Sequence, residues 1–135
     1  GTMIRTGEGA GITGVIMNQQ TVDIFNPKTI RATMGSIFRV PFVYVPELSP
    51  VLTQMHEKGI HTYAAHLKGQ KYYDSFSFRE PTAFLIGNEG NGLTKEISDQ
   101  AGQYLKIPME GKVESLNASI AAALLMYEAH RQRNL

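Results

Sequence analysis

The chain has 135 residues, of which 42% are hydrophobic and 19% charged, a composition that suits one globular domain and excludes a disordered, collagen-like or coiled-coil protein. It has no cysteine, which excludes a disulfide scaffold, a thiolate zinc site and a cysteine nucleophile. Its formal net charge of +1 is far below that of a dedicated nucleic-acid module, so any grip on RNA needs a local patch, an oligomer or an attached domain. No apolar run approaches the roughly 20 residues of a membrane span, and the first residues do not read as a signal peptide.

Apolar runs alternate with helical patterns in the first part of the chain. Asn26 and Pro27 mark a helix start, because Asn is a good N-cap and Pro suits the first helical position. We expect the apolar stripe of this helix to hold Ile30, Met34, Ile37 and Phe38. The other elements predicted here are a strand at 14–17, a strand at 42–45, and a helix that opens at Ser49-Pro50 and stops at Gly59.

The second part of the chain continues the alternation. The predicted elements are strands at 61–67, 82–86 and 104–107, a short helix over 93–101 and a long helix from Ser115 to about Arg131. Residues 118–126 are apolar almost all round, which suggests a subunit interface. The segment 68–80 reads as a loop. It mixes basic and aromatic residues as RNA contacts often do, although a solvated loop is the simpler interpretation, and the residues concerned are Lys68, Lys71, Tyr72 and Tyr73.

Strands separated by helices predict an α/β fold with a mainly parallel sheet and helices on both faces. Ligands of such sheets usually sit at the carboxyl ends of the strands. The segment Gly87–Gly92 follows the predicted strand 82–86 and holds three glycines, which permit positive φ and a close backbone approach to a ligand. A plain tight turn is an equally good interpretation of this loop taken alone. Its spacing matches neither the dinucleotide fingerprint nor the P-loop.

Two further signals are weaker on their own. Ile107-Pro108-Met109 ends a strand, and Ser115-Leu116-Asn117 opens the last helix, where Ser115 acting as a helix cap is the better interpretation of those residues by themselves. Arg5 stands near the start of the chain, and a lone arginine is usually a surface residue. The histidines are scattered and predict no metal site; they are His56, His61, His66 and His130.

Taken in order, these segments resemble the SpoU/TrmH family of RNA ribose 2′-O-methyltransferases, within the SPOUT superfamily. Residues 1–6 resemble the second half of the family's first motif, and residues 84–93 resemble the second motif. Residues 107–109 with 113–121 resemble the third, and the stretch 26–41 is similar to the family's linking segment. The resemblance covers essentially the whole chain.

The resemblance implies a fold, a cofactor and a set of site residues. The family has a C-terminal trefoil knot, forms homodimers and binds S-adenosylmethionine, and no metal or membrane partner is expected. The residues that match the cofactor-binding positions or their neighbours are Leu85, Ile86, Gly87, Asn88, Glu89, Gly92, Ile107, Met109, Ser115, Leu116 and Asn117. Those that match the catalytic positions are Arg5, Glu89, Ser115 and Asn117.

The implied reaction is methyl transfer from S-adenosylmethionine to a ribose 2′-hydroxyl of tRNA or rRNA, mainly by holding donor and hydroxyl in line. Arg5 matches the arginine proposed to activate the hydroxyl. Because arginine stays protonated in proteins, a contact to a phosphate or to the developing alkoxide is the safer physical role. Ser115 and Asn117 would orient the cofactor or the ribose, and Glu89 would fix its loop through hydrogen bonds.

The family comparison also predicts the organisation of the chain. Residues 1–135 correspond to a SpoU-type catalytic domain that starts inside the first motif, so we expect the family's first strand and the N-terminal RNA-binding domain of relatives to be missing. Two alternatives stay open: a non-catalytic RNA-binding or dimerisation module, and a generic nucleotide-binding α/β domain that rests on the glycine loop alone. A cytoplasmic location is expected.

Overall fold

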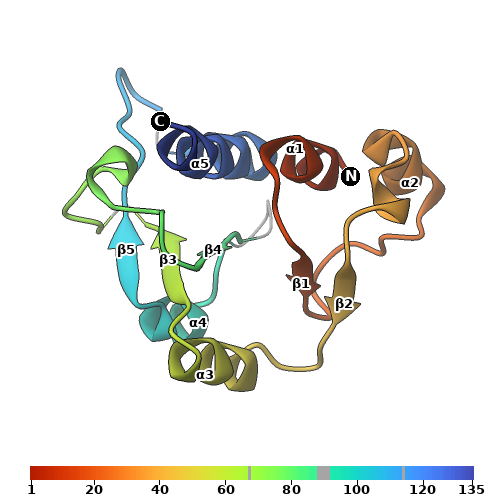
Figure 1. Ribbon diagram of the computed structural model, residues 1–135, viewed down its shortest axis with the longest axis horizontal. Coiled ribbons are helices and arrows are strands. Elements are labelled where there is room, and N and C mark those ends of the chain that lie inside the picture. Colours follow the sequence, from red (N-terminus) through yellow and green to blue (C-terminus); the bar gives the residue numbers. More distant parts are fainter. Residues whose placement is uncertain (67, 88–91, 114) are drawn as a thin grey trace. The chain divides into compact units, whose positions relative to one another are not determined.

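The computed structural model describes residues 1–66, 68–87, 92–113 and 115–135. The chain forms two compact units, Gly1–Glu47 and Leu48–Leu135. Figure 1 shows strands alternating with helices along the sequence, and every strand pair is parallel among the described residues. The predicted α/β class with parallel sheets is therefore confirmed, whereas the trefoil knot stays a prediction.

The first unit contains α1 (Thr2–Ala10), β1 (Val15–Met17), α2 (Pro27–Thr33), the 3-10 helix η1 (Ser36–Phe38) and β2 (Phe42–Tyr44). Strands β1 and β2 pair in parallel, with Val15 opposite Phe42. The predicted strands at 14–17 and 42–45 are thus confirmed within one residue at each end. The buried apolar side chains of this unit form one cluster: Ile4, Met17, Ile24, Ile37 and Val40.

Helix α1 is an element that the sequence pattern did not predict, since Gly7 and Gly9 lower its helix propensity. Tertiary packing overrides that cost. A Cβ at Gly1 would lie 2.5 Å from the Thr29 carbonyl oxygen and 2.6 Å from the Ala32 Cβ, so glycine lets the helix start come close to α2. Glu8 also ties α1 to the η1 region, because its carboxylate accepts from Ser36 Oγ at 2.6 Å and Arg39 Nη2 at 3.0 Å.

The predicted apolar stripe of the second helix is wrong for Met34 and Phe38, whereas Ile30 packs against the core and Ile37 is buried in it. Asn26 does cap α2, and its Oδ1 accepts a hydrogen bond from the Lys28 N–H at 2.9 Å. The helix then ends at Thr33, because Met34 and Gly35 both adopt left-handed backbone with φ of 50° and 90°. The side chain of Met34 is left exposed there, and Phe38 is 86% exposed. Two consecutive left-handed residues are a tertiary outcome that apolar spacing does not encode.

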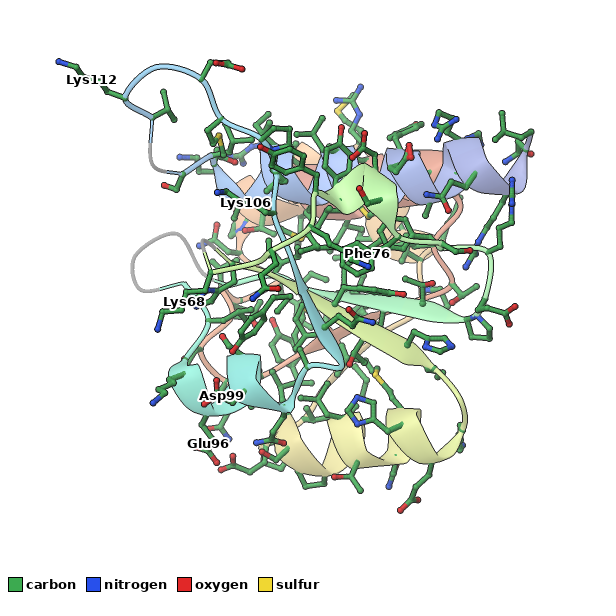
Figure 2. The ribbon with its side chains drawn as sticks, turned by 90° about the vertical axis from the view of Figure 1, so that its left-hand side faces the viewer. Lys68, Phe76, Glu96, Asp99, Lys106 and Lys112 are labelled. Atoms are coloured by element: carbon green, nitrogen blue, oxygen red, sulfur yellow. The ribbon has the colours of Figure 1, made fainter. Side chains whose placement is uncertain are left out.

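The second unit is built on a three-stranded parallel sheet in the order β4-β3-β5. Its elements are α3 (Ser49–Glu57), β3 (His61–Ala65), the 3-10 helix η2 (Tyr73–Ser75), β4 (Thr82–Leu85), α4 (Lys95–Gln100), β5 (Gln103–Leu105) and α5 (Ala118–Arg133). In Figure 2 the sheet lies between α5 on one side and α3 with α4 on the other. This arrangement matches the predicted helices on both faces.

The central strand β3 shows how both faces are filled. Tyr63 packs on the α5 side, in a cluster with Phe78, Leu105 and Leu125. Its neighbours Thr62 and Ala64 are also buried, as expected for alternate faces of a strand that is covered on both sides.

The segment 68–80, predicted as a loop, is only briefly regular but contains a core residue. Phe78 is fully buried. Its backbone N–H donates to Gln132 Oε1 at 2.6 Å, and Gln132 Nε2 donates to the Phe76 carbonyl at 2.9 Å. Arg133 Nε donates to the Phe78 carbonyl at 2.8 Å. The last turn of α5 therefore supplies the hydrogen bonds that a neighbouring strand would otherwise give this segment.

Candidate functional site

The carboxyl ends of β4 and β5 flank the end of β3. Ala64 of β3 pairs with both Leu85 of β4 and Tyr104 of β5. Since neighbouring strands lie about 4.8 Å apart, the two outer strands end about 10 Å from each other. The chain leaves β4 through Ile86 and Gly87 and leaves β5 toward Ile107, so these predicted site residues share one edge of the sheet.

The two described glycines of the loop have different reasons to be glycine. A Cβ at Gly87 would collide with the backbone of Gly92 and Leu93, so the two ends of the loop touch there. Gly92 has a φ of 65°, in the left-handed region that favours glycine. The positive φ at Gly92 is as predicted, and the contact at Gly87 fits the interpretation as a tight turn. The close approach to a ligand stays a prediction. Asn88 and Glu89, which the resemblance assigns to the site, lie outside the described residues.

The remaining cofactor positions offer apolar walls and backbone groups. The predicted side chains that share this character are half-buried: Leu85, Ile86, Ile107, Met109 and Leu116. Ile86 and Ile107 pack against the aromatic cluster around Tyr63. Apolar walls beside the backbone N–H and C=O groups of strand ends are the usual lining of a small-molecule site in such folds. Such walls can accept the apolar part of a small-molecule ligand, and the strand-end backbone groups can accept its polar part.

The polar residues before α5 differ from their prediction. Asn117, and not Ser115, caps the helix, and its Oδ1 accepts from the Ser119 N–H at 2.8 Å. The interpretation of Ser115 as the cap is therefore wrong; Ser115 is exposed and lies two residues before the cap. Asn117 combines a good cap with helical periodicity starting at Ala118, which is a signal that the sequence does carry. The cap uses Oδ1, and the Nδ2 donors of Asn117 take no part in it.

Arg5 belongs to the first compact unit, where its side chain is exposed on α1. The candidate catalytic residues thus come from separate parts of the chain. Arg5 lies on α1, Ser115 and Asn117 precede α5, and Glu89 lies outside the described residues.

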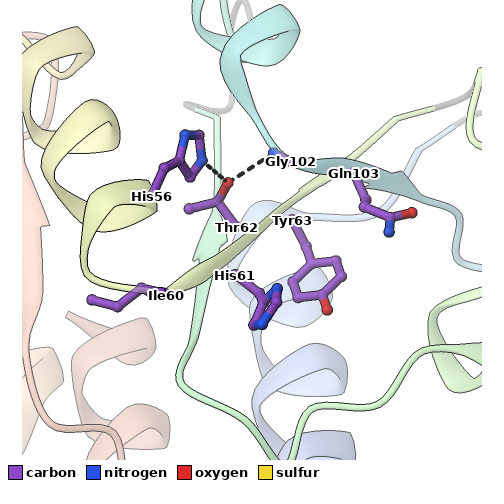
Figure 3. A pocket seen from close by; sticks show the side chains of 8 residues that line it. His56, Ile60, His61, Thr62, Tyr63, Gly102 and Gln103 are labelled. Atoms are coloured by element: carbon purple, nitrogen blue, oxygen red, sulfur yellow. Dashed lines mark hydrogen bonds between the residues drawn. The ribbon is translucent and has the colours of Figure 1, made fainter.

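A hollow of about 230 Å³ opens at the opposite end of the same sheet, where the strands begin. Figure 3 shows Thr62 at its centre, with its hydroxyl oxygen 2.8 Å from His56 Nε2 and accepting from the Gly102 N–H at 2.8 Å. Tyr63 also lines this hollow, and burial raises the pKa of its phenol. Sequence reasoning did not find this network, because a threonine in a strand carries no distinguishing pattern.

Among the described residues, no group of three or more histidines and carboxylates lies together in a way that could hold a metal ion. No helix in those ranges is long and apolar enough to cross a membrane.

Known proteins give a consistent comparison. A model of the SpoU rRNA Methylase family matches residues 1–127. The chain is 35% identical over 127 residues to the 23S rRNA (guanosine(2553)-2′-O)-methyltransferase RlmP of Bacillus subtilis, an alignment that covers 94% of the chain and 51% of that protein. The chain spans about half the length of the curated relatives it matches.

Solved structures agree with the sequence comparison. The SpoU methyltransferase AviRb from Streptomyces viridochromogenes, solved in complex with AdoMet, superposes with a TM-score of 0.91 at 33% identity over 98% of this chain and 55% of that one. An AdoMet-bound rRNA methyltransferase from Sinorhizobium meliloti superposes with a TM-score of 0.87 at 35% identity over 96% of this chain and 50% of that one.

Proposed function

The chain belongs to the SpoU rRNA Methylase family, and from that premise we propose that residues 1–135 form the catalytic domain of an S-adenosylmethionine-dependent RNA methyltransferase. Its target is a ribose 2′-hydroxyl of tRNA or rRNA, and its place of action is the cytoplasm. The observation that carries the proposal is that β4 and β5 end at the same edge of the sheet. Gly87 and Ile107, which match cofactor-binding positions of the family motifs, follow these two strand ends.

The cofactor would be held by the backbone at Gly87, Ile107 and Leu116, with half-buried apolar side chains beside them. When bound, S-adenosylmethionine supplies a methyl group on a sulfonium, already activated toward an oxygen nucleophile. The contribution of the chain is therefore positional. The strand ends, and the contact of Gly87 with Gly92 and Leu93, position backbone groups before binding, which lowers the entropic cost of alignment.

Arg5 acts on the ribose side of the reaction in this proposal. Its guanidinium stays charged at every physiological pH, so it stabilises negative charge on the ribose oxygen or contacts the adjoining phosphate. Its exposed position on α1 leaves it accessible to a macromolecular substrate. Ser115 and the Nδ2 group of Asn117 orient the cofactor or the ribose, and Glu89 fixes the loop that contains it.

Methyl transfer is the direct test. Radiolabelled methyl groups from S-adenosylmethionine should appear in tRNA or rRNA, and Arg5→Ala should abolish incorporation without changing the thermal midpoint. Arg31→Ala, an exposed arginine on α2, is the matched control and should keep full transfer. Full activity of Arg5→Ala would contradict the role of Arg5. RNA binding without any transfer by the unsubstituted chain would favour a non-catalytic RNA-binding or dimerisation module.

Two substitutions separate the structural and chemical roles of Asn117. Asn117→Ala removes the helix cap and should cost about 1 kcal/mol of stability. Asn117→Asp keeps an acceptor oxygen for the cap but loses the Nδ2 donors. Loss of transfer in both variants, with normal thermal stability only in Asn117→Asp, assigns the Nδ2 group to the reaction. Normal methyl transfer in Asn117→Asp would mean that Asn117 acts only as a helix cap and has no role in the reaction.

We further propose that the chain forms a homodimer through α5. Three apolar side chains one helical turn apart are exposed there, with Ile120 at 53%, Leu124 at 38% and Tyr127 at 46%. An apolar stripe of this kind on a helix is typical of a protein interface. Light scattering at micromolar concentration should give a dimer, and Leu124→Glu should give a folded monomer. A monomeric unsubstituted chain would contradict this proposal.

A further inference from the structure

A second hollow, of about 250 Å³, lies beside β5 at the edge of the three-stranded sheet. We call it the lysine hollow, and its lining residues are Lys68, Gln70, Lys71, Phe76, Gln103 and Tyr104. Figure 2 shows Lys68 and Phe76 beside β5, on the face turned toward the viewer. The cofactor positions named above are not among its lining residues, so the hollow needs its own explanation.

The basic segment that forms one wall is fixed to β5 by backbone hydrogen bonds. The His66 N–H donates to the Leu105 carbonyl at 3.0 Å, and the Lys106 N–H donates to the Lys71 carbonyl at 3.0 Å. A Cβ at Gly69 would lie 3.0 Å from the Leu105 carbonyl carbon, so the segment runs close against the strand. The backbone at His66, Gly69 and Lys71 therefore lies against β5, and the side chains of Lys68 and Lys71 line the hollow from there.

The other wall is aromatic. The Tyr104 ring stacks on the His66 ring with centroids 4.7 Å apart and an angle of 16° between the planes. Tyr104 is fixed in addition by donating its hydroxyl to Asp99 Oδ1 at 2.7 Å. Phe76 is half-buried against Tyr63, which holds its ring in place. The Lys71 ammonium lies 5.9 Å from the centroid of Phe76.

The polar groups of the hollow complement an anion next to a planar ring. Lys68 and Lys71 are both exposed, and within the ranges that the structure describes neither forms a salt bridge with a carboxylate. The side-chain amides of Gln70 and Gln103 carry both donors and acceptors, as the edge of a nucleobase does. A volume of about 250 Å³ lies just under the roughly 300–1,000 Å³ of pockets for drug-sized ligands, which suits a single nucleotide.

We propose that the lysine hollow receives one nucleotide of a single-stranded RNA segment, with its phosphate beside the Lys68 and Lys71 ammonium groups and the edge of its base facing the side-chain amides of Gln70 and Gln103. Positive side chains along a groove together with aromatic platforms are the general means of binding single strands. The inference rests on the proposed function, because RNA is the substrate there. It adds an RNA contact outside the cofactor edge. The lysine hollow would also supply the local basic patch that a chain with a net charge of only +1 needs in order to bind RNA.

The test is fluorescence anisotropy of a labelled 12-nucleotide single-stranded RNA with the full chain, repeated across salt concentrations. Lys68→Ala/Lys71→Ala should weaken binding about 5-fold at 0.1 M salt and reduce the slope of log affinity against log salt by about 0.7, because the two lysines share one phosphate and each lost phosphate contact on a single strand removes about 0.7. Lys58→Ala/Lys95→Ala removes the same charge outside the hollow and is the matched control. It should change affinity less than 3-fold.

Titration of both double variants with S-adenosylhomocysteine reports on the cofactor edge and on folding, and neither should differ from the unsubstituted chain. An equal loss of RNA affinity in the two variants, or no loss in either, would overturn the inference. Competition by uridine monophosphate at the concentration of the oligonucleotide would also overturn it, since the ligand would then be a mononucleotide.

The inference and the proposed function fail in different ways. A chain that binds S-adenosylhomocysteine but no RNA would overturn the inference and leave the cofactor assignment standing. RNA binding lost in Lys68→Ala/Lys71→Ala, in a chain that binds no S-adenosylhomocysteine, would support the inference and contradict the proposed function.

Discussion

The two ends of the three-stranded sheet use their residues in opposite ways. At the end where the strands begin, buried polar side chains already have hydrogen-bond partners within the protein. Examples are the hydroxyl of Thr62 and the amide of Gln132. At the carboxyl end, the residues that follow β4 and β5 are half-buried and largely apolar, and the fixed polar groups are those of the backbone. Side-chain hydrogen bonds therefore stabilise the end where the strands begin. At the carboxyl end we expect backbone groups to bind a ligand.

The contrast gives the two ends of the sheet different interpretations. The hollow around His56 and Thr62 contains a hydrogen-bond network that joins α3, β3 and the residue before β5, so its polar groups are already used. The carboxyl edge instead combines backbone groups with a loop whose geometry demands glycine at Gly87. Substitutions at the first end should therefore change stability, and substitutions at the second should change ligand binding.

The largest effect is expected at the carboxyl edge. Gly87→Ala puts a Cβ into the backbone of Gly92 and Leu93, so the loop must open and the backbone groups at the strand ends must move. We expect the affinity for S-adenosylhomocysteine to fall at least about 100-fold, the scale of a misplaced binding group. Calorimetric titration measures it. Gly59→Ala strains a left-handed turn before β3, with φ of 77°, and is the control for a loss of stability alone. Unchanged affinity of Gly87→Ala would refute the role of the contact between Gly87 and Gly92.

The opposite end should respond in stability. Gln132→Leu leaves the buried Phe78 N–H and the Phe76 carbonyl without their partner, and each unsatisfied buried group costs about 1–3 kcal/mol. We expect a loss of about 2–4 kcal/mol in the free energy of unfolding by urea, with cofactor affinity unchanged in the folded protein. Gln54→Leu, on the exposed part of α3, should be nearly neutral. If Gln132→Leu lost affinity for S-adenosylhomocysteine and kept normal stability, the contrast between the two ends of the sheet would be wrong.

The smallest effect is a pH dependence within α5. The hydrogen bond from Arg131, followed by that from Gln132, lowers the pKa of Glu128 below its ordinary value. A lowered pKa in the folded state means that the stabilisation is present above the ordinary carboxyl pKa and is lost as the pH falls through the folded value. Thermal midpoints between about pH 6 and pH 3 should therefore fall less steeply for Glu128→Gln than for the unsubstituted chain. Parallel curves would contradict this assignment.

The sequence predicted the parts of the fold that depend on local pattern. The strands at 82–86 and 42–45, the cap at Asn26 and the glycine loop all follow from apolar runs and turn residues. Helix α1 was missed because Gly7 and Gly9 argue against a helix, and the helix is stabilised instead by burial of Ile4 in the core cluster with Ile37. The burial of Phe78 was missed because its hydrogen-bond partner, Gln132, lies 54 residues away.

The candidate site divides in the same way. The carboxyl edge was predictable, because parallel strands bring their carboxyl ends together and glycines mark the loop. The cap at Asn117 was assigned to Ser115, two residues too early, since either residue type can cap a helix. The lysine hollow needed the structure, because its walls come from the segment after β3, from Phe76 and from β5.

The most direct test of the central claim is calorimetric titration of the 135-residue chain with S-adenosylhomocysteine. We predict saturable binding of about one molecule per chain, which the Gln132→Leu variant keeps and the Gly87→Ala variant loses. No binding by a sample shown to be folded would contradict the assignment of the carboxyl edge of β4 and β5 as the cofactor site.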